Sequence, residues 1–458
     1  MQGLTCPRCD KQLNKQADDS IVCKACGVSF PTLNATVPFI WSEPGSSLRD
    51  WRNRYNATLA DIETQIVDAA TTPSTATPAT QRRIAHLHSA WKQHLAELQA
   101  LLAPLNVGEA LAKETHLALR TNLPSHHGVL SYAQNIHRDW CWGDDENQAV
   151  IRHLVDALAS AGEKPNNQID NILVLGCGAG RLAYDLHRAL QPSHTWALDS
   201  NPLLCLIADR MCAGQAMQFT EFPLAPISLE DSARERSLSA PVAISDIEFV
   251  CADAMRAPFA NGQFDLVVTP WLIDVVDASL SESLTNIHRL LKPGGTWLNH
   301  GSVAFPGAQA KNRLTTEEVV EISTANGFQV VFQADIELPY LASPASRQTR
   351  RELVHTQIAE RNQAEYTKLE RKHQHLPDWI VAGRTPVPLT PGFQSQITST
   401  RIHAFIMSLI DGKRTVRDMA KLMEDQRLMP VEQAIPAISQ FLTTMYEEET
   451  RAQGRAGM

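Results

Sequence analysis

Ile172-Leu173-Val174-Leu175-Gly176-Cys177-Gly178-Ala179-Gly180-Arg181-Leu182 is the stretch that decides the fold. An apolar run of strand-forming residues ends in three alternating glycines, and a segment with helical character begins at Arg181. A second apolar strand, Thr195-Trp196-Ala197-Leu198, ends at Asp199. A strand, a glycine turn and a helix in this order expose backbone N–H groups to a ligand, because glycine has no side chain to obstruct them. Asp199 ends the second strand, where an acid can accept hydrogen bonds from two ribose hydroxyls.

The spacing of the glycines distinguishes two kinds of nucleotide site. A dinucleotide-binding turn favours Gly-x-Gly-x-x-Gly, because its third glycine admits a pyrophosphate. Here Gly176, Gly178 and Gly180 are followed by Leu182 and Ala183. This pattern resembles that of class I S-adenosylmethionine-dependent methyltransferases, whose cofactor has no phosphate. The resemblance implies a Rossmann-like α/β domain with a seven-stranded sheet and S-adenosyl-L-methionine as cofactor. A glycine turn that binds no ligand is the alternative.

Composition limits the class of protein. At 458 residues the chain is too long for one core, and roughly two to four domains are expected. The net charge of −9 argues against general nucleic-acid binding. No apolar run approaches the ~20 residues of a membrane span, and the N-terminus lacks the pattern of a signal peptide. We therefore expect a cytoplasmic enzyme. Five scattered cysteines fit buried thiols in a reducing compartment: Cys141, Cys177, Cys205, Cys212 and Cys251.

The remaining four cysteines form two Cys-x-x-Cys pairs near the N-terminus. Cys6 and Cys9 are separated by thirteen residues from Cys23 and Cys26. Two such pairs suit a tetrahedral thiolate site, and four protein ligands leave no open position for catalysis. The sequence therefore predicts a structural Zn²⁺ site in residues 1–42. This segment resembles the small zinc ribbons found beside bacterial methyltransferases.

Three further regions follow the cysteine segment. Residues 43–120 have helical periodicity, with a Thr- and Pro-rich linker at 71–80. Residues 121–362 alternate strands and helices, which is typical of a parallel sheet, and residues 221–245 form a polar insertion. The expected strands are 172–175, 195–198, 247–251, 264–269, 296–299, 329–336 and 352–360.

Residues 388–450 are expected to form a small helical domain, with Thr415 as the N-cap of a helix. Asp411-Gly412-Lys413-Arg414-Thr415-Val416 followed by an apolar helix resembles the winged-helix modules related to peptide-binding PqqD proteins. The resemblance implies a peptide or protein partner, held by addition of a strand. A domain for packing or dimerisation is the alternative.

Further motifs support the methyltransferase resemblance. Asp253 ends the third expected strand, next to Ala254, and resembles the acid that pairs with the adenine amino group. Pro270 follows the fourth strand, and Leu291-Lys292-Pro293-Gly294-Gly295 resembles the turn before the fifth. Because ligands of open α/β sheets bind at the carboxyl ends of the strands, these positions are expected to share one cleft.

A narrower resemblance covers about residues 130–361. Asn135-Ile136-His137-Arg138-Asp139-Trp140 resembles the "Q-x-x-R-D-W" segment of the carnosine N-methyltransferase family, and Trp271-Leu272-Ile273-Asp274 resembles its "F-x-I-D" strand end. Lys292 to Gly301 and Tyr340 with Pro344-Ala345-Ser346 continue the likeness. The resemblance implies that Asp274 and Tyr340 face the methyl acceptor. It implies cofactor contacts for Asn135, Arg138, Gly176, Asp199, Asp253, Ala254 and Pro270.

Several of these residues have a second interpretation. Arg138 suits a bidentate contact with the cofactor carboxylate, or it is a surface charge. Asp274 either orients an imidazole or amine or caps a helix. Where the family has a Tyr-His pair, this chain has Phe305 and Pro306, which speaks against carnosine itself as acceptor. His300 is nearby, but strand alternation leaves its direction open.

Three functions are compatible with these features. The first is N-methylation of an imidazole or amine in a small molecule or peptide. The second is methylation of a protein or ribosomal peptide recruited by the terminal domains. The third is a non-catalytic zinc-ribbon adaptor. The intact glycines, Asp199 and Asp253 argue against the third.

Overall fold

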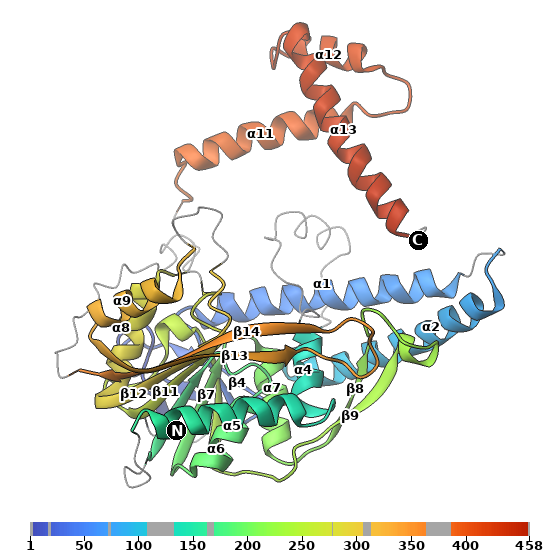
Figure 1. Cartoon of the computed structure of the whole chain (residues 1–458). Helices are drawn as coiled ribbons and strands as arrows, with labels where there is room; N and C mark the ends of the chain where they lie inside the picture. The colour runs from blue at the N-terminus through green and yellow to red at the C-terminus, as the bar shows by residue number, and fades with distance from the viewer. Residues whose placement is uncertain are drawn as a thin grey trace. The chain divides into compact units, whose positions relative to one another are not determined.

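The computed structural model describes residues 3–16, 20–71, 75–107, 132–162, 169–276, 278–305, 313–362 and 386–456. The chain divides into two compact units, Met1–Arg371 and Lys372–Met458. The first contains a large mixed sheet with helices on both faces, and the described part of the second is helical (Figure 1).

The first unit begins with short strands and two long helices and continues as an alternation of strands and helices. Its strands are β1 (Asn14–Lys15), β2 (Ile21–Val22), β3 (Ser29–Phe30), β4 (Thr32–Leu33), β5 (Val37–Ile40), β6 (Asn171–Leu175), β7 (His194–Asp199), β8 (Met217–Glu221), β9 (Arg234–Leu238), β10 (Ile247–Ala252), β11 (Phe264–Pro270), β12 (Leu291–Gly301), β13 (Phe328–Tyr340) and β14 (Arg350–Arg361). Its helices are α1 (Pro44–Ala70), α2 (Pro78–Leu102), α4 (Ala133–Trp140), α5 (Asp145–Ser160), α6 (Arg181–Leu190), α7 (Pro202–Cys212), α8 (Leu280–Leu290) and α9 (Thr316–Ala325), with short 3-10 turns including η4 (Ala254–Arg256).

The order of the strands identifies the type of sheet. It is β13-β14-β12-β11-β6-β7-β10-β5-β4, and all seven strands expected from the sequence are present. Numbered along the chain, those seven run 3-2-1-4-5-7-6 from β10 to β13. β14 is antiparallel to both neighbours, whereas β10, β7, β6, β11 and β12 are parallel. A dinucleotide-binding sheet has the order 3-2-1-4-5-6 instead. The antiparallel β14, placed between β12 and β13, departs from the wholly parallel sheet that the alternation predicted. The number of strands agrees with the seven-stranded Rossmann-like sheet that the methyltransferase resemblance implied.

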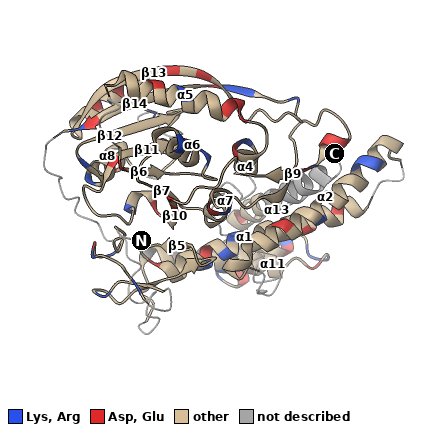
Figure 2. Ribbon diagram, turned by 90° about the horizontal axis from the view of Figure 1, so that it is seen from below, with Lys and Arg blue, Asp and Glu red and all other residues tan. Residues whose placement is uncertain are grey.

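Two strands from the cysteine-bearing segment extend this sheet. β5 pairs with β10 in parallel, with Phe39 opposite Cys251 and Ile40 opposite Ala252. β4 then pairs with β5 in antiparallel. Figure 2 shows β5 next to β10. The N-terminal segment is therefore built into the α/β sheet, which has nine strands among the described residues rather than the expected seven.

Alternating side chains of each central strand enter two separate cores. Ile172 and Val174 pack with α1, α2, α4, α5, α6 and α7 on one face. Leu173 and Leu175 pack with α8, α9 and the cysteine-bearing segment on the other. A parallel strand covered on both faces has to be apolar throughout, which explains the unbroken run before Gly176.

The helical segment and the insertion lie against each other. α2 begins at Pro78, with Thr77 as its N-cap, inside the stretch 71–80 expected as a linker. β8 leads into the insertion, and β9, which lies within it, pairs with β8 as an antiparallel hairpin. Trp91 of α2 stacks on Phe222, with ring centres 3.7 Å apart, and so joins the two regions.

The second unit is described as α11 (Pro391–Ser408), α12 (Val416–Asp425) and α13 (Val431–Ala456). Thr415 caps α12 as expected, and its side chain forms a reciprocal capping box with Asp418. A small core includes Ile406, Met419, Met423 and Ile438. Among the described helices of both units, none has the length and apolarity needed to cross a bilayer.

Gly180 provides a test of the turn between β6 and α6. Its φ is +91°, and a Cβ there would lie 2.6 Å from Cβ of Ala208. Gly162 has φ +85° but no atom within 4 Å of such a Cβ. Gly180→Ala should lower the free energy of unfolding by about 2–4 kcal/mol, because backbone strain adds to overpacking. Gly162→Ala should cost about 1–2 kcal/mol, from strain alone. Urea denaturation measures both, and equal losses would contradict the packing argument.

Candidate functional site

The glycine turn and the end of β7 are joined by backbone hydrogen bonds. The N–H groups of Gly176 and Cys177 donate to the carbonyl of Leu198, at 2.8 and 2.9 Å. The N–H of Gly178 donates to Oδ2 of Asp199 at 2.9 Å. A Cβ on Gly178 would meet no atom within 4 Å, so the turn is open on that side. A ligand can therefore approach the backbone beside Asp199.

Asp199 is a buried carboxylate with defined partners. Its Oδ1 accepts a hydrogen bond from the N–H of Asn201 at 2.9 Å, while Oδ2 is held by Gly178. Burial raises the pKa of Asp199 to about 6, although hydrogen bonds from Asn201, Gly178 and Ser200 oppose the rise. Each carboxylate oxygen has two acceptor positions. Asp199 can thus accept two further hydroxyl groups, provided that it is ionised.

Asp253 and Pro270 end strands at the same edge of the sheet. Cys251 of β10 lies opposite Asp199 of β7, so Asp253 extends just beyond Asp199. Its Oδ1 accepts from the N–H of Met255 at 2.9 Å and caps η4, which begins at Ala254. Burial raises the pKa of Asp253. Pro270 ends β11 opposite His300. The strand ends predicted from the sequence therefore share the edge at which α/β sheets bind ligands. They are Gly176, Asp199, Asp253 and Pro270.

Helix α4 is attached directly to the glycine turn. Trp140 Nε1 donates to the carbonyl of Ala179 at 2.9 Å, and Arg181 Nη1 donates to the carbonyl of Asp139 at 2.9 Å. Asn135 is half-buried, one turn before Arg138 on this helix. These contacts bring the expected carboxylate-binding residues of α4 close to the turn.

Arg138 lies in a network of charged and aromatic groups. Its Nε and Nη2 donate to Oδ1 of Asp139, at 2.9 and 2.7 Å, and Glu146 is 3.7 Å away. The guanidinium carbon is 5.7 Å from the ring centre of Tyr340. Arg138 is thus not a simple surface charge. It connects α4, which is attached to the glycine turn, with the end of β13.

Aromatic rings gather where β11, β12 and β13 end. Trp271 lies 5.7 Å from Tyr340 and 4.9 Å from His300, measured between ring centres. Its backbone φ is +43°, a strained conformation for a residue other than glycine. Gly301 permits the close approach, because a Cβ there would lie 3.0 Å from the Trp271 backbone. We call Trp271, Tyr340 and His300 the aromatic cluster.

The structure settles the direction of His300. His300 pairs with Thr356 of β14, and Tyr340 pairs with Arg350 of the same strand. Thr356 and Arg350 are an even number of residues apart, so His300 and Tyr340 lie on the same face of the sheet. Nδ1 of His300 lies 2.8 Å from Oγ1 of Thr356. Its buried Nε2 has no hydrogen-bond partner within the described part of the chain. Burial lowers the pKa of His300 to about 3, so the ring is neutral.

The Asp274 side chain holds the segment that follows β12 by hydrogen bonds. Its Oδ2 accepts from Oγ of Ser302 at 3.1 Å and from the N–H of Ala304 at 2.8 Å. The side chain is buried. The N-cap of the next helix, α8, is Ser279, so the helix-cap interpretation of Asp274 was wrong. Asp274 fixes the segment that follows β12. Of the Phe305-Pro306 pair, Pro306 lies outside the described residues.

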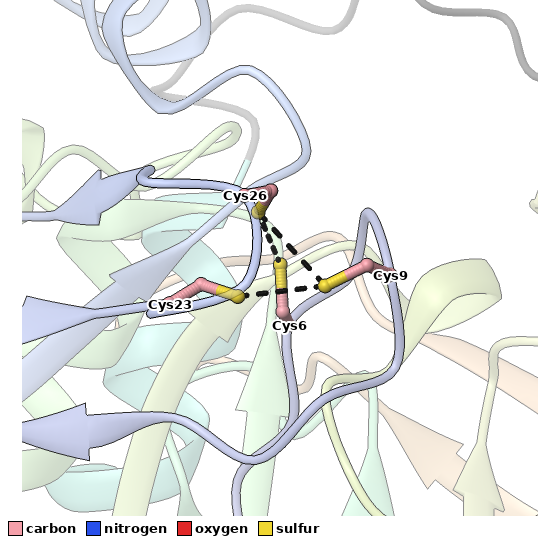
Figure 3. Close-up of side chains that lie close together, drawn as sticks. All are labelled: Cys6, Cys9, Cys23 and Cys26. Carbon is pink, nitrogen blue, oxygen red and sulfur yellow. Dashed lines mark hydrogen bonds between the residues drawn. The ribbon is translucent and has the colours of Figure 1, made fainter.

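The four N-terminal thiols converge on one point (Figure 3). Sγ separations are 3.5 Å for Cys6–Cys26, 3.4 Å for Cys9–Cys23 and 3.9 Å for Cys9–Cys26. Zn–S bonds of about 2.3 Å in a tetrahedron require S···S distances of ~3.8 Å, so the cluster has the dimensions of a zinc site. Burial raises the pKa of Cys23, but hydrogen bonds from Cys26 and Cys9 bring it down to about 7.

Comparison with known proteins agrees with the strand order. Residues 209–298 match the family model described as a methyltransferase domain. The first unit carries a methyltransferase domain. The matched stretch extends from α7 into β12, and it includes Asp253, Pro270 and Asp274.

Curated relatives of this methyltransferase domain are distant. The carnosine N-methyltransferases of Mus musculus and Rattus norvegicus are each 24% identical over 221 residues, covering 44% of this chain and 53% of theirs. The chain thus spans about half the length of these relatives.

Solved structures are also similar to part of this chain. N-methyltransferase NodS from Bradyrhizobium japonicum, in complex with S-adenosyl-l-homocysteine, is 16% identical, with 51% of this chain and 97% of that chain covered and a TM-score of 0.33. The Haloferax volcanii complex of the Trm112 methyltransferase activator with a methyltransferase has 17% identity, coverage of 52% and 100%, and a TM-score of 0.33. At such scores, the strand order remains the basis of the fold assignment.

The sequence did not point to two residues near the candidate site. Glu352 of β14 accepts from Trp271 Nε1 at 3.3 Å. Tyr132 precedes α4, and its pKa is raised by burial and then by the nearby charge of Asp199. Tyr132 adjoins the motif that begins at Asn135, which was a usable signal. No sequence signal pointed to Glu352, because its contact with Trp271 depends on the antiparallel pairing of β14.

Substitution of Thr356 tests whether its hydroxyl group stabilises His300 of the aromatic cluster. Its Oγ1 lies 2.8 Å from both His300 Nδ1 and His153 Nε2. Thr356→Val keeps the shape but leaves both imidazoles without this partner, so stability should fall by about 2–3 kcal/mol. Thr356→Ser retains the hydroxyl and should cost about 1 kcal/mol, for one buried methyl group. Chemical denaturation compares the two, and equal losses would show that the hydroxyl is unimportant.

Proposed function

We propose that this protein is an S-adenosylmethionine-dependent methyltransferase that methylates a nitrogen atom, in an imidazole or amine of a small molecule or peptide. The observation that carries the proposal is the geometry around Asp199. Its carboxylate is held by the N–H of Gly178 beside an open glycine turn, at the carboxyl edge of the sheet. The family match supports methyl transfer, and the names of the curated relatives favour nitrogen as the acceptor atom.

The cofactor-binding residues have separate tasks in this proposal. When bound, S-adenosyl-L-methionine supplies an activated methyl group on a sulfonium centre. Gly176, Gly178 and Gly180 allow close approach of the backbone, and Asp199 accepts hydrogen bonds from the ribose hydroxyls. Asp253 and the backbone of Ala254 contact the adenine. Asn135 and Arg138 hold the carboxylate, because a guanidinium has five N–H donors and can serve Asp139 and a ligand together.

The acceptor is proposed to bind at the aromatic cluster, beyond Pro270. Trp271 and Tyr340 offer ring faces that stabilise a methyl group carrying positive charge. Asp274 and Tyr340 are proposed to face the acceptor, and Asp274 also holds the segment after β12 through Ser302 and Ala304. The aromatic cluster would orient the lone pair of the acceptor nitrogen toward the methyl group that the bound cofactor supplies, and the proton of that nitrogen would be released to bulk water. Alignment in a dry pocket then accounts for most of the rate gain.

We also propose that Cys6, Cys9, Cys23 and Cys26 bind one Zn²⁺ ion. The tetrahedral dimensions of the cluster support this assignment. Four thiolates complete the coordination, so the ion has a structural role.

The pKa of Asp199 predicts how cofactor binding depends on pH. Because this pKa is raised to about 6, the carboxylate that accepts the hydroxyls is increasingly protonated below pH 6. Calorimetry should give a dissociation constant for S-adenosylmethionine about tenfold higher at pH 5 than at pH 7. Asp199→Asn should bind more weakly and lose this dependence. A flat profile for the natural protein would exclude Asp199 as the hydroxyl acceptor.

The reaction itself is tested with methyl-labelled S-adenosylmethionine and a desalted lysate recombined with its small-molecule fraction. Label should appear on nitrogen in a small molecule or short peptide, identified by mass spectrometry. Asp199→Ala and Tyr340→Ala should abolish transfer. Asp335→Ala is a matched control, because Asp335 binds His355 on the opposite face of the sheet.

The other outcomes decide between the alternatives. Label in proteins would favour a protein or ribosomal peptide acceptor recruited by the terminal regions. Absence of both labelling and cofactor binding would reject the methyltransferase and favour an adaptor.

A further inference from the structure

We propose that the N-terminal segment, residues 20–62 together with 3–16, completes the cofactor site by holding both of its acidic strand ends. Metal in the four-cysteine cluster and the hydroxyl of Tyr55 would then each raise the affinity for S-adenosylmethionine. This inference rests on the proposed function. It goes further, because it makes a region outside the methyltransferase domain part of the cofactor site.

The cysteine cluster is directly connected to the segment that follows Asp253. Thr5, the neighbour of Cys6, donates its N–H to the carbonyl of Pro258 at 2.7 Å. Leu4 forms an antiparallel bridge with Phe259, and both side chains are buried in one core. Asp253 and Ala254, proposed above to bind adenine, are therefore only a few residues along the chain from this contact. We call residues 3–16 and 20–30, which carry the four cysteines, the metal loop.

Further contacts hold the same segment from other directions. Ser42 accepts from Nη1 of Arg256 at 3.4 Å, and β5 pairs with β10 just before Asp253. The buried Arg289 of α8 donates to the carbonyls of Ala257 at 2.7 Å and Phe259 at 2.8 Å. Loss of the metal would remove the contacts of the cysteine loop but leave those of Arg289. The segment should then loosen while the sheet stays folded.

Tyr55 of α1 holds the other acidic strand end. Its hydroxyl donates to Oδ1 of Asn201 at 2.7 Å and accepts from the N–H of Leu203 at 2.9 Å. Asn201 in turn donates its own N–H to Oδ1 of Asp199 at 2.9 Å. Tyr55 is fully buried. A hydrogen-bonded chain thus runs from α1 to the carboxylate proposed to hold the ribose, which makes Tyr55 a positioning residue.

These two connections predict an effect on affinity rather than on the chemistry of transfer. A site that is held in its binding geometry binds more tightly, because less ordering is needed when the ligand arrives. The metal loop acts on the adenine side and Tyr55 on the ribose side. The two effects should be separable, since they reach the cofactor through different residues.

The metal connection is tested on the full-length protein in its zinc-loaded, chelated and zinc-restored forms. Metal content, S-adenosylmethionine affinity by calorimetry and hydrogen exchange of residues 249–259 are measured together. Zinc removal should weaken affinity about tenfold, the change that corresponds to roughly 1.4 kcal/mol of ordering. Exchange in 249–259 should rise, and zinc should restore both.

Substitutions confirm that the cluster itself is responsible. Cys26→Ser should reproduce the chelated state. Cys212→Ser is the control, because Cys212 at the end of α7 is a buried thiol outside the four-cysteine cluster. It should retain zinc and full affinity. Unchanged affinity after complete zinc removal would overturn this half of the proposal.

Tyr55→Phe and Tyr184→Phe form a matched pair. Tyr184 is also fully buried, and its hydroxyl donates to the carbonyl and accepts from the N–H of one residue, Val242, at 3.0 Å each. Both variants lose one buried hydroxyl and should lose similar thermal stability. Only Tyr55→Phe should weaken cofactor affinity, by about two- to tenfold, as expected for one hydrogen bond.

The outcomes separate this inference from the proposed function. If the natural protein binds the cofactor and neither zinc removal nor Tyr55→Phe changes the affinity, the inference fails and the methyltransferase proposal stands. Equal weakening in Tyr55→Phe and Tyr184→Phe would reduce Tyr55 to a structural role and also overturn it. If the natural protein binds no S-adenosylmethionine, the proposed function fails and the inference fails with it.

Discussion

The hydrogen bond from the Gly178 N–H to the Asp199 carboxylate is the interaction on which the candidate site depends. It joins the turn after β6 to the end of β7, and these two strands are neighbours at the centre of the sheet. Glycine permits the positive φ that aims this N–H at the acid. The neighbouring strand ends, with Asp253 and Pro270, are then positioned relative to this pair by parallel register.

Burial makes this arrangement costly and explains why so much of the chain supports it. Asp199 is removed from water, which raises its pKa, and it is stabilised by backbone N–H groups rather than by a basic side chain. Asn201, one of those partners, is itself held by Tyr55 of α1. On the other side, the cysteine-bearing segment pairs with β10 and contacts residues after Asp253. Residues 3–16 and 20–62 therefore pack as one structure with the candidate site.

Much of this could be predicted, since the information was local. The apolar runs predicted the central strands, because a strand that is covered on both faces is mostly apolar. The glycine spacing and the acids at strand ends indicated the edge at which a ligand binds. The direction of His300, the contact of Glu352 with Trp271 and the task of Asp274 could not be predicted. Each depends on which residues β14 and the segment after β12 bring opposite them.

The sequence by itself determined the central strands, the glycine turn and the four metal-ligand candidates, because periodicity and short spacings act within a few residues of the chain. The tertiary structure alone decided that β5 joins β10, that Tyr55 reaches Asn201 and that the aromatic cluster forms beside Arg138. These contacts connect residues far apart along the chain. Their formation depends on the packing of whole elements, which no local pattern records.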